Sequence, residues 1–512
     1  MGRRNRPRTA RGRAEHGGVR AGRPARTSVP VTWQQYDLLV DSLAHRGTGH
    51  HVEQLTWHWH GPLDTQRFTA AWQSVVDRET VLRAGVVWGT RPRLLFHDRA
   101  RAEVVRHPAG SVDWPALVEE DRRRGFDLRR PCPLRITLVD LADTDADADT
   151  GTDTGADAGA VRVLLTFHHA LLDAWSVFIL LEEVCRAYLA GGVLPGGERR
   201  PDLRDWARWL ERQDTAPARD FWAHALPGPT PVVLPLRPGP DTAQRGCGRA
   251  EARLSAAEAA RLHRWTAAQA MPDSGALQAV WALLLYRAAQ TPGAAPVGFG
   301  VTVSGRGVAL DSVERLLGPM RNHLPVVVRI DPHHRISHLL AMLRDGALER
   351  AAYEWVSARQ VHEWTARTAR EARLLDSLVA LESTPRPSSD LHHDLAGAGI
   401  RLQPGRARDA QPAFPLALLA RHDRDGSLCL ALAHDRARVS DADAALLLGH
   451  CARLLRRLPA TAPAATVHEV LSALGGADLP RGAPPRRTQN TVRLRLRSRG
   501  GRAARKRGSS ES

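Results

Sequence analysis

Two adjacent histidines, His168 and His169, precede Asp173 in the sequence His-His-Ala-Leu-Leu-Asp-Ala-Trp-Ser. Histidine accepts or donates a proton near neutral pH, so this pair could provide general acid–base chemistry. An apolar, β-favouring run precedes the pair at residues 161–167, and apolar residues recur at helical spacing over residues 177–188. The pattern predicts a strand-to-helix turn that holds the imidazoles rigidly at a surface or tunnel.

A histidine pair alone is weak evidence, because the chain has 23 histidines and four His-His pairs, at residues 50–51, 168–169, 333–334 and 392–393. The second pair is distinguished by the strand before it and by Asp173, a Trp-Ser pair and a helix after it. We therefore take His169 as the candidate catalytic residue. His168 is the second candidate, and its place before the turn favours a buried, hydrogen-bonded ring that holds the loop.

The motif resembles the HHxxxDG signature of the condensation domains of nonribosomal peptide synthetases, members of the chloramphenicol acetyltransferase-like acyltransferase superfamily. The resemblance covers about residues 31–475 and is stronger in the first half. Further segments match in the same order: Thr32-Trp-Gln-Gln35, Gly61-Pro-Leu-Asp64, Arg78 to Ala84, Phe126-Asp-Leu, Gly298-Phe-Gly300, Ser304-Gly-Arg306 and Leu317 to Pro325.

The sequence departs from the family pattern at a position that bears on the chemistry of the site. Ala174 replaces the glycine that follows the motif aspartate, and that glycine normally allows a close backbone approach. The methyl group of Ala174 would narrow the substrate channel. Two consequences therefore remain open: an altered choice of substrate, and an inactive site. The order Asp-Ala-Trp-Ser favours condensation over the related epimerisation domains.

The resemblance implies acyl transfer with no bound cofactor. An amine, or less often a hydroxyl, attacks a thioester carried on the phosphopantetheine of a donor carrier protein. The acceptor would be held on a second carrier protein or be a free small molecule. His169 would orient the nucleophile or take its proton, and no acyl-enzyme is required. Such a protein contributes mainly by aligning two substrates.

The motif aspartate is expected to be structural. A carboxylate at this turn would point away from His169 and pair with a guanidinium, and Arg83 is the candidate partner because it matches the arginine of the second family motif. The alternative is that Arg83 only solvates a helix end. Deleting one partner of a buried pair typically costs roughly 3–5 kcal/mol, so Asp173→Ala should act as a folding defect.

Three other residues could line a substrate tunnel. Ser304 and Asn322 lie in or near the fifth family motif, and Trp175 follows the histidine motif. Trp175 has a second interpretation, which we prefer, as an ordinary core aromatic at the start of a helix.

We expect no metal site. The alternating stretch from Trp57 to His60 predicts a strand with one solvent-exposed face. No cysteines or carboxylates at the spacing of metal ligands accompany its histidines. The acidic run at residues 143–157 lacks the final glutamate of a calcium-binding loop.

The net charge of +17 is carried by the two ends of the chain. Nine arginines and one glutamate give residues 1–30 a charge of +8, and ten arginines, one lysine and one glutamate give residues 481–512 a charge of +10. The remainder is nearly neutral. We therefore expect basic disordered tails at 1–30 and 476–512 and no nucleic-acid binding beyond non-specific tail contacts.

The 445 residues between the tails, 31–475, exceed what one hydrophobic core usually supports. We expect an N-terminal lobe at 31–195, which carries the HHxxxD motif and an acidic flexible loop at 142–160, and a C-terminal lobe at 196–475. The apolar runs at 133–139 and 161–167 would be neighbouring antiparallel strands, with the acidic loop as the tip of their hairpin. The resemblance implies an α/β (α+β) fold, in which two chloramphenicol acetyltransferase-like lobes form a V with the active site between them.

The five cysteines show no paired framework, which fits a reducing cytoplasm. We find no signal-peptide core and no run of roughly 20 apolar residues, so we expect a cytoplasmic protein without membrane contact.

The given sequence shows no adenylation domain, and the only stretch like a carrier-protein attachment site, residues 474–479, has no serine to carry phosphopantetheine. We therefore expect a free-standing condensation enzyme that forms an amide and acts on carrier proteins in trans. Two alternatives remain open: an ester-forming or coenzyme-A-dependent acyltransferase that uses the same His169, and a catalytically silent docking protein.

Overall fold

The structure, a computed structural model, describes most of the chain between the two basic tails. The described residues are 28–142, 160–197, 200–226, 246–291, 293–365, 376–382, 389–407, 414–423, 425–462 and 464–475. The predicted tails and the acidic loop lie outside this part of the chain, except for residues 28–30, 142 and 160.

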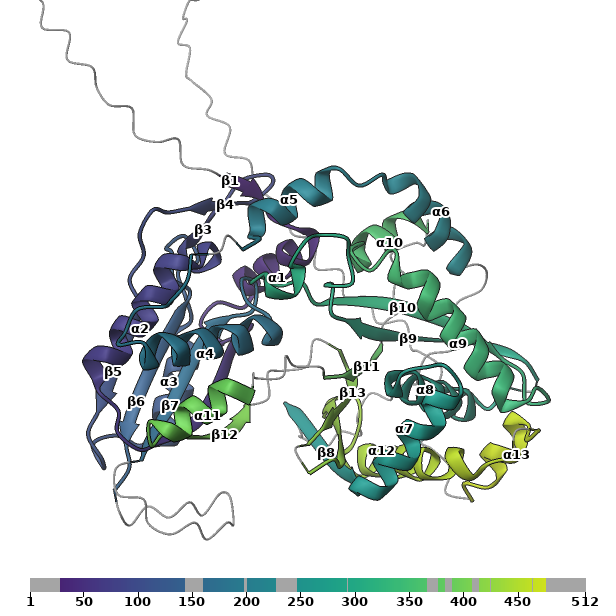
Figure 1. Ribbon diagram of the computed structural model, residues 1–512. Coiled ribbons are helices and arrows are strands. Elements are labelled where there is room, and N and C mark those ends of the chain that lie inside the picture. Colours follow the sequence, from purple (N-terminus) through teal and green to yellow (C-terminus); the bar gives the residue numbers. More distant parts are fainter. Residues whose placement is uncertain are drawn as a thin grey trace, which may run out of the picture.

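The described part contains both helices and strands along its whole length (Figure 1). The strands are β1 (Ser28–Pro30), β2 (Val52–His60), β3 (Ala84–Val87), β4 (Arg93–Phe96), β5 (Glu103–His107), β6 (Leu134–Asp140), β7 (Val161–His168), β8 (Cys247–Leu254), β9 (Ala295–Val303), β10 (Asn322–Ile330), β11 (Ser377–Leu381), β12 (Arg401–Ala407), β13 (Leu416–His422) and β14 (Leu428–Asp435). The helices are α1 (Trp33–Ala44), α2 (Thr65–Arg78), α3 (Trp114–Arg124), α4 (Ala174–Leu189), α5 (Leu203–Glu211), α6 (Thr215–Ala225), α7 (Ala256–Ala268), α8 (Asp273–Ala289), α9 (Ile336–Ala351), α10 (Ala358–Trp364), α11 (Ser389–Gly397), α12 (Asp441–Arg457) and α13 (Val467–Ser472). None of the described helices combines the length and the apolar character that a membrane span needs.

The first main sheet has the order β12-β2-β7-β6-β5. β7 pairs antiparallel with both β2 and β6, which confirms the hairpin that the sequence predicts around the acidic loop. Alternation along β2 sends its side chains to two faces. Trp59 packs edge-on against Phe68 of α2, whereas Gln54 donates to the Val118 carbonyl of α3. Helices α2 and α3 therefore cover opposite faces.

The second main sheet has the order β10-β9-β11-β13-β14-β8. Helix α8 contacts this sheet through β9, β10 and β11 and also touches α7, α9, α12 and α13. Its apolar residues are buried almost all round, as expected of a helix that lies between a sheet and other helices. In Figure 1 this sheet and its helices lie on the right, and the first sheet lies on the left with α2 and α4. The two sheets thus carry their own helices, and one contiguous cluster of buried apolar residues extends through both halves.

One late segment returns to the first sheet. β12 pairs antiparallel with β2, with Arg401 opposite His60 and Gln403 opposite His58. Helix α11, which precedes it, packs on α4, and both elements stand out in green among the purple and blue first half in Figure 1. The expected lobe at 196–475 therefore differs from the structure over residues 389–407. The hydrogen-bonding edge of β2 accepts a strand that is distant in the sequence.

Candidate functional site

The two histidines lie on the turn between β7 and α4, as the sequence predicts. β7 ends at His168 and α4 begins at Ala174, with Asp173 as its N-cap. We call residues 168–173 the histidine turn. Its backbone is held from two sides, because the His169 N–H donates to the His51 carbonyl at 2.9 Å and the Gln35 amide donates to the Ala170 carbonyl at 3.1 Å.

His168 is buried, and both of its ring nitrogens are occupied. Its Nδ1 accepts from the Ala170 N–H at 3.1 Å, so the ring proton must lie on Nε2, which is 3.1 Å from the Ser42 hydroxyl. That hydroxyl donates onward to the Leu38 carbonyl at 2.8 Å. Burial, reinforced by His51 and His169, lowers the pKa of His168 to about 3. This ring is neutral and holds the turn, in agreement with the sequence-based expectation.

His169 differs because only one of its nitrogens is held. Its Nδ1 lies 3.1 Å from the Leu172 carbonyl, which can only accept, so Nδ1 carries the proton. The lone pair of a neutral imidazole is then on Nε2, and none of the described residues forms a hydrogen bond with that atom. The ring is half-buried. The arrangement leaves one basic nitrogen oriented and available to a substrate.

The partner of Asp173 is Arg306, so the predicted Asp173–Arg83 pair is wrong. Arg306 lies in the segment between β9 and β10, and its guanidinium nitrogens donate to both carboxylate oxygens, at 2.8 and 3.1 Å. Burial alone would raise the pKa of Asp173, but the Arg306 charge and the hydrogen bonds from Arg306 and Ser176 outweigh it and lower that pKa. Side-chain exposures of 1% for Asp173 and 4% for Arg306 show that the pair is sequestered from water.

Arg83 instead serves the end of a helix, which was the alternative interpretation. It donates to the carbonyls of Val76 at 3.0 Å and of Asp77, both in the last turn of α2, and to the carbonyl of His97 at 3.2 Å. Carbonyls in a last helical turn have no partner within the helix, so a guanidinium satisfies them.

The start of α4 is joined to the second lobe by further contacts. The Ser176 hydroxyl lies 3.0 Å from both the carbonyl and the N–H of Gly318, and the Trp175 indole donates to the Glu314 carbonyl at 2.8 Å. Gly305 permits the close approach of the two chain segments, since a Cβ at its φ of +68° would overlap the Met320 carbonyl oxygen. The histidine turn is thus fixed to both lobes.

The three residues predicted to line a tunnel have identifiable contacts. Trp175 is half-buried, and the Arg306 guanidinium lies 5.5 Å from its ring centroid. Ser304 is exposed, and its hydroxyl accepts from the Arg306 N–H at 3.1 Å. Asn322 is buried, and its amide donates to the carbonyls of Glu354 and Val356 at 2.8 and 2.6 Å. The Asn322 donors therefore hold a turn of the protein. Ala174, which stands where the family pattern has glycine, is half-buried at the first position of α4.

His323 is a residue near the histidine turn to which the sequence assigned no role. Its Nδ1 lies 3.1 Å from the Thr302 hydroxyl on the neighbouring strand. Burial, reinforced by Arg321 and His169, lowers the pKa of His323 to about 3. Arg321, two residues before it, donates its N–H to Asp173 at 3.2 Å, so His323 approaches the histidine turn from the second lobe. No sequence signal singled it out, because the pairing of β9 and β10 brings it there.

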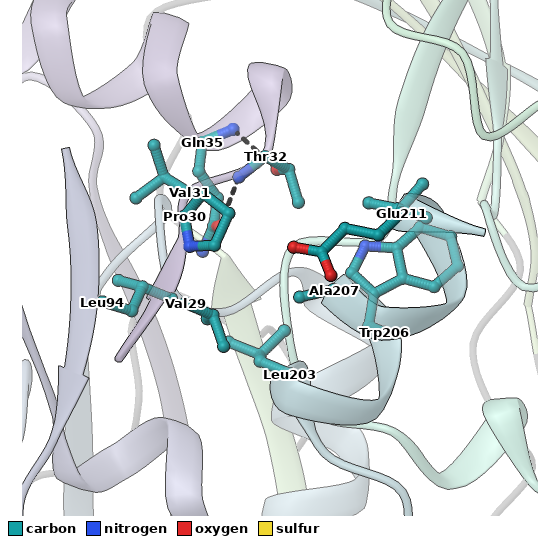
Figure 2. A pocket seen from close by; sticks show the side chains of 11 residues that line it. Val29, Pro30, Val31, Thr32, Gln35, Leu94, Leu203, Trp206, Ala207 and Glu211 are labelled. Atoms are coloured by element: carbon teal, nitrogen blue, oxygen red, sulfur yellow. Dashed lines mark hydrogen bonds between the residues drawn. The ribbon is translucent and has the colours of Figure 1, made fainter. Parts of the chain in front are cut away.

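A small apolar cavity of about 80 Å³ lies beside Gln35, which also supports the histidine turn. Figure 2 shows Gln35 and Thr32 joined by their reciprocal hydrogen bonds, with Leu94, Leu203 and Trp206 around the cavity. The cavity is too small for a pantetheine arm. It is a packing feature of the contact between β1, α1 and α5.

Three side chains have the arrangement of metal ligands. One ligand atom each from Asp41, His50 and His51 lies within 4.8 Å of the others. The sequence-based expectation of no metal site considered the histidines of β2 and not this group, whose members come from the end of α1 and the following turn.

Comparison with known proteins gives consistent matches. The family model described as condensation domain matches residues 25–473. A linear gramicidin synthase protein of Brevibacillus parabrevis is 30% identical over 371 residues, which are 70% of this chain and 4% of that protein. Chondramide synthase of Chondromyces crocatus is 28% identical over 370 residues, which are 70% of this chain and 9% of that protein. The chain thus spans less than a tenth of the length of these curated relatives.

Solved structures have the same fold. The complex of the X-domain and OxyB from teicoplanin biosynthesis matches with a TM-score of 0.69 and 21% identity, over 88% of this chain and 96% of that chain. The first condensation domain of the calcium-dependent antibiotic synthetase, in complex with a substrate analogue, matches with a TM-score of 0.65 and 17% identity, over 86% and 99% of the two chains. These likenesses confirm the expected mixed α/β, chloramphenicol acetyltransferase-like fold.

Proposed function

Because the chain belongs to the condensation-domain family, we propose that it is an acyltransferase that joins an acyl or peptidyl group to an amine and forms an amide. The donor is a thioester on the phosphopantetheine of a carrier protein. The acceptor amine is held on a second carrier protein or is a free small molecule. The chain acts on these carriers in trans, without a bound cofactor of its own.

The observation that carries this proposal is the difference between the two nitrogens of His169. Nδ1 donates to the Leu172 carbonyl, which fixes both the tautomer and the direction of the ring. Nε2 therefore carries the lone pair, and none of the described residues hydrogen-bonds it. A general base needs a positioned, unprotonated nitrogen within reach of the reacting group. His169 meets this requirement and His168 does not, since both of its nitrogens are occupied.

The reaction requires one bond to form and one to break. The acceptor nitrogen attacks the thioester carbonyl carbon, and the C–N bond forms as the C–S bond breaks. Nε2 of His169 accepts a proton from the attacking amine, and the departing pantetheine thiolate takes up a proton. A thioester is already activated, so placing the two substrates accounts for much of the rate.

The buried ion pair between Asp173 and Arg306 supports this chemistry by holding the histidine turn in place. The pair joins the N-cap of α4 to the second lobe, and the carboxylate is fully used by Arg306, Ser176 and the N–H groups of Met320 and Arg321. Asp173 is therefore a positioning residue, and His169 keeps its basic nitrogen for substrate.

The test offers the purified chain a carrier loaded with an acyl thioester, together with amine acceptors, and identifies the product by mass spectrometry. We expect an amide, and we expect His169→Ala to slow its formation by about 100-fold or more. The matched control is His333→Ala, which removes an exposed histidine of another His-His pair. Equal product from a well-folded His169→Ala variant would contradict the proposed mechanism. Acyl-coenzyme A and alcohol acceptors in parallel reactions distinguish the coenzyme-A-dependent and ester-forming alternatives.

Ala174 favours a second candidate, a catalytically silent docking protein. The extra methyl group stands where the family pattern has glycine, beside the reacting groups. One solved relative of the same fold, the X-domain of teicoplanin biosynthesis, is described in complex with OxyB, a second protein. Turnover of any thioester that depends on His169 excludes this candidate. Absence of turnover with the wild-type chain and its Ala174→Gly variant would favour it.

A further inference from the structure

A group of histidines outside the candidate catalytic site converges on one carboxylate. Two imidazoles reach the same oxygen of Asp41: Nε2 of His50 lies 2.6 Å from Oδ2 and Nε2 of His51 lies 2.8 Å from it. Nδ1 of His45 lies 3.2 Å from the other oxygen, Oδ1. We call these four residues the Asp41 cluster. The rings contact one another, with centroid separations of 4.8 Å for His45 and His50 and 4.3 Å for His50 and His51.

The backbone holds these side chains in place. Asp41 and His45 are four residues apart at the end of α1, so they share one face of the helix. The chain then turns through residues 45–51, where Arg122 donates to the Thr48 carbonyl at 2.7 Å. At the far end of this turn the His51 carbonyl accepts the His169 N–H. The ligand atoms are thus brought together by a turn that is tied at both ends.

The separations suit a four-coordinate cation. Metal–nitrogen and metal–oxygen distances in zinc sites are roughly 2.0–2.2 Å, so neighbouring ligands in a tetrahedron lie about 3.3 Å apart. The N···O separations of 2.6 Å for His50 and 2.8 Å for His51 would have to open by about 0.7 and 0.5 Å. The side-chain exposures of 13% for His51, 23% for His50 and 42% for Asp41 leave room for that adjustment. Exposure also gives a cation an entry path.

The donor set indicates the class of cation. Imidazole nitrogens with one carboxylate suit zinc and the neighbouring late transition metals, whereas calcium and magnesium take six or more oxygen ligands. We propose that the Asp41 cluster binds one divalent cation of the zinc class through His50 Nε2, His51 Nε2 and the Asp41 carboxylate. His45, which is 51% exposed, or a water molecule completes the tetrahedron.

Such a cation would act on the histidine turn through the backbone. It cross-links the end of α1 to the residue before β2, and His51 in that position holds the His169 N–H. Metal binding therefore stabilises the strand end against which the histidine turn rests. This inference does not depend on the proposed acyl transfer, since it concerns binding of the metal alone.

The experiment titrates the full chain, freed of metal with EDTA and desalted, with Zn²⁺ by calorimetry. Co²⁺ added in place of Zn²⁺ reports the geometry, because tetrahedral cobalt absorbs strongly in the visible. We expect one equivalent to bind, and we expect His50→Gln/His51→Gln to weaken binding by about tenfold or more. Asp41→Asn keeps the shape of the side chain and should also weaken Zn²⁺ binding. This single variant tests the proposal if the double variant does not fold.

The matched control is His333→Gln/His334→Gln, a second His-His pair beside an aspartate, with 3.8 Å between His334 and Asp331. This variant should keep the wild-type affinity. Circular dichroism in EDTA verifies that each variant is folded. The proposal is overturned if the wild-type chain binds no Zn²⁺ equivalent, or if folded Asp41→Asn and His50→Gln/His51→Gln chains bind as tightly as wild type.

Discussion

The histidine turn and the Asp41 cluster contain the same residue types, a His-His pair and an aspartate, but they differ in what the aspartate binds. Asp173 is buried, and Arg306 and backbone donors occupy both of its oxygens. Asp41 is 42% exposed, and imidazole nitrogens occupy its oxygens. Because Arg306 pairs with Asp173, an imidazole nitrogen of His169 remains available to a substrate. No arginine is seen to pair with Asp41 among the described contacts, and the imidazoles of His50 and His51 bind its carboxylate.

The largest expected effect comes from breaking the buried pair. Asp173→Ala leaves the Arg306 charge buried without its partner and removes the N-cap of α4, so the free energy of unfolding should fall by roughly 3–5 kcal/mol. Asp41→Ala removes partly exposed contacts and should cost about 1 kcal/mol or less in EDTA. Urea denaturation of both variants measures the difference.

A double variant sharpens this comparison. Asp173→Ala/Arg306→Ala should cost clearly less than the sum of the two single variants, because the second substitution removes the charge that the first one strands. Strictly additive costs would show that the two side chains do not stabilise the fold as a pair.

The second effect is a loss of stability in mild acid. The pKa of His168 is about 3 in the folded chain, against 6.5 as the ordinary value. Between pH 3 and pH 6.5, His168 is therefore protonated in the unfolded chain and neutral in the folded chain. Stability is full above pH 6.5 and falls as the pH drops below it, by about 2 kcal/mol from this residue at pH 5. His323, with its pKa also at about 3, acts in the same direction.

His168→Gln isolates the contribution of the buried ring. Glutamine cannot titrate, so the decrease in unfolding free energy between pH 7 and pH 5 should be smaller by about 2 kcal/mol than in wild type. Urea unfolding in EDTA at both pH values measures this, with His333→Gln as the exposed control. An unchanged pH dependence in His168→Gln would mean that the ring titrates normally and is not sealed.

The smallest effect concerns the outer edge of the contact between the lobes. Trp175→Phe keeps an aromatic ring near Arg306 and loses the indole donor to the Glu314 carbonyl. Because that carbonyl is on an exposed residue and can bind water, the expected cost is about 0.5–1.5 kcal/mol in unfolding free energy. A loss as large as that of Asp173→Ala would place the main link between the lobes at Trp175 instead of at the ion pair.

Local patterns in the sequence predicted the histidine turn well. The apolar run before His168 and the helical spacing after Asp173 placed β7 and α4 correctly, because both signals lie within the elements themselves. The sealed state of His168 also followed from its position on the strand. The antiparallel pairing of β6 with β7 followed from two apolar runs with an acidic connection between them.

Long-range partners could not be predicted in the same way. Arg83 stood in a matching motif, yet Arg306 reaches Asp173 because the segment between β9 and β10 folds back onto the start of α4. The return of β12 to the edge of β2 depends on pairing between residues more than 300 positions apart. The Asp41 cluster had a local signal, since Asp41 and His45 have helical spacing, but its meaning depends on how the turn before β2 directs His50 and His51.

The role of His169 as general base is tested most directly by the rate of amide formation. This rate is compared among His169→Ala, wild type and His333→Ala, and the free energy of unfolding of each is measured alongside. We expect His169→Ala to lose about 100-fold or more in kcat/KM while its unfolding free energy stays close to that of wild type. His333→Ala should match wild type in both quantities. A folded His169→Ala chain that forms amide at the wild-type rate would show that His169 is not the general base.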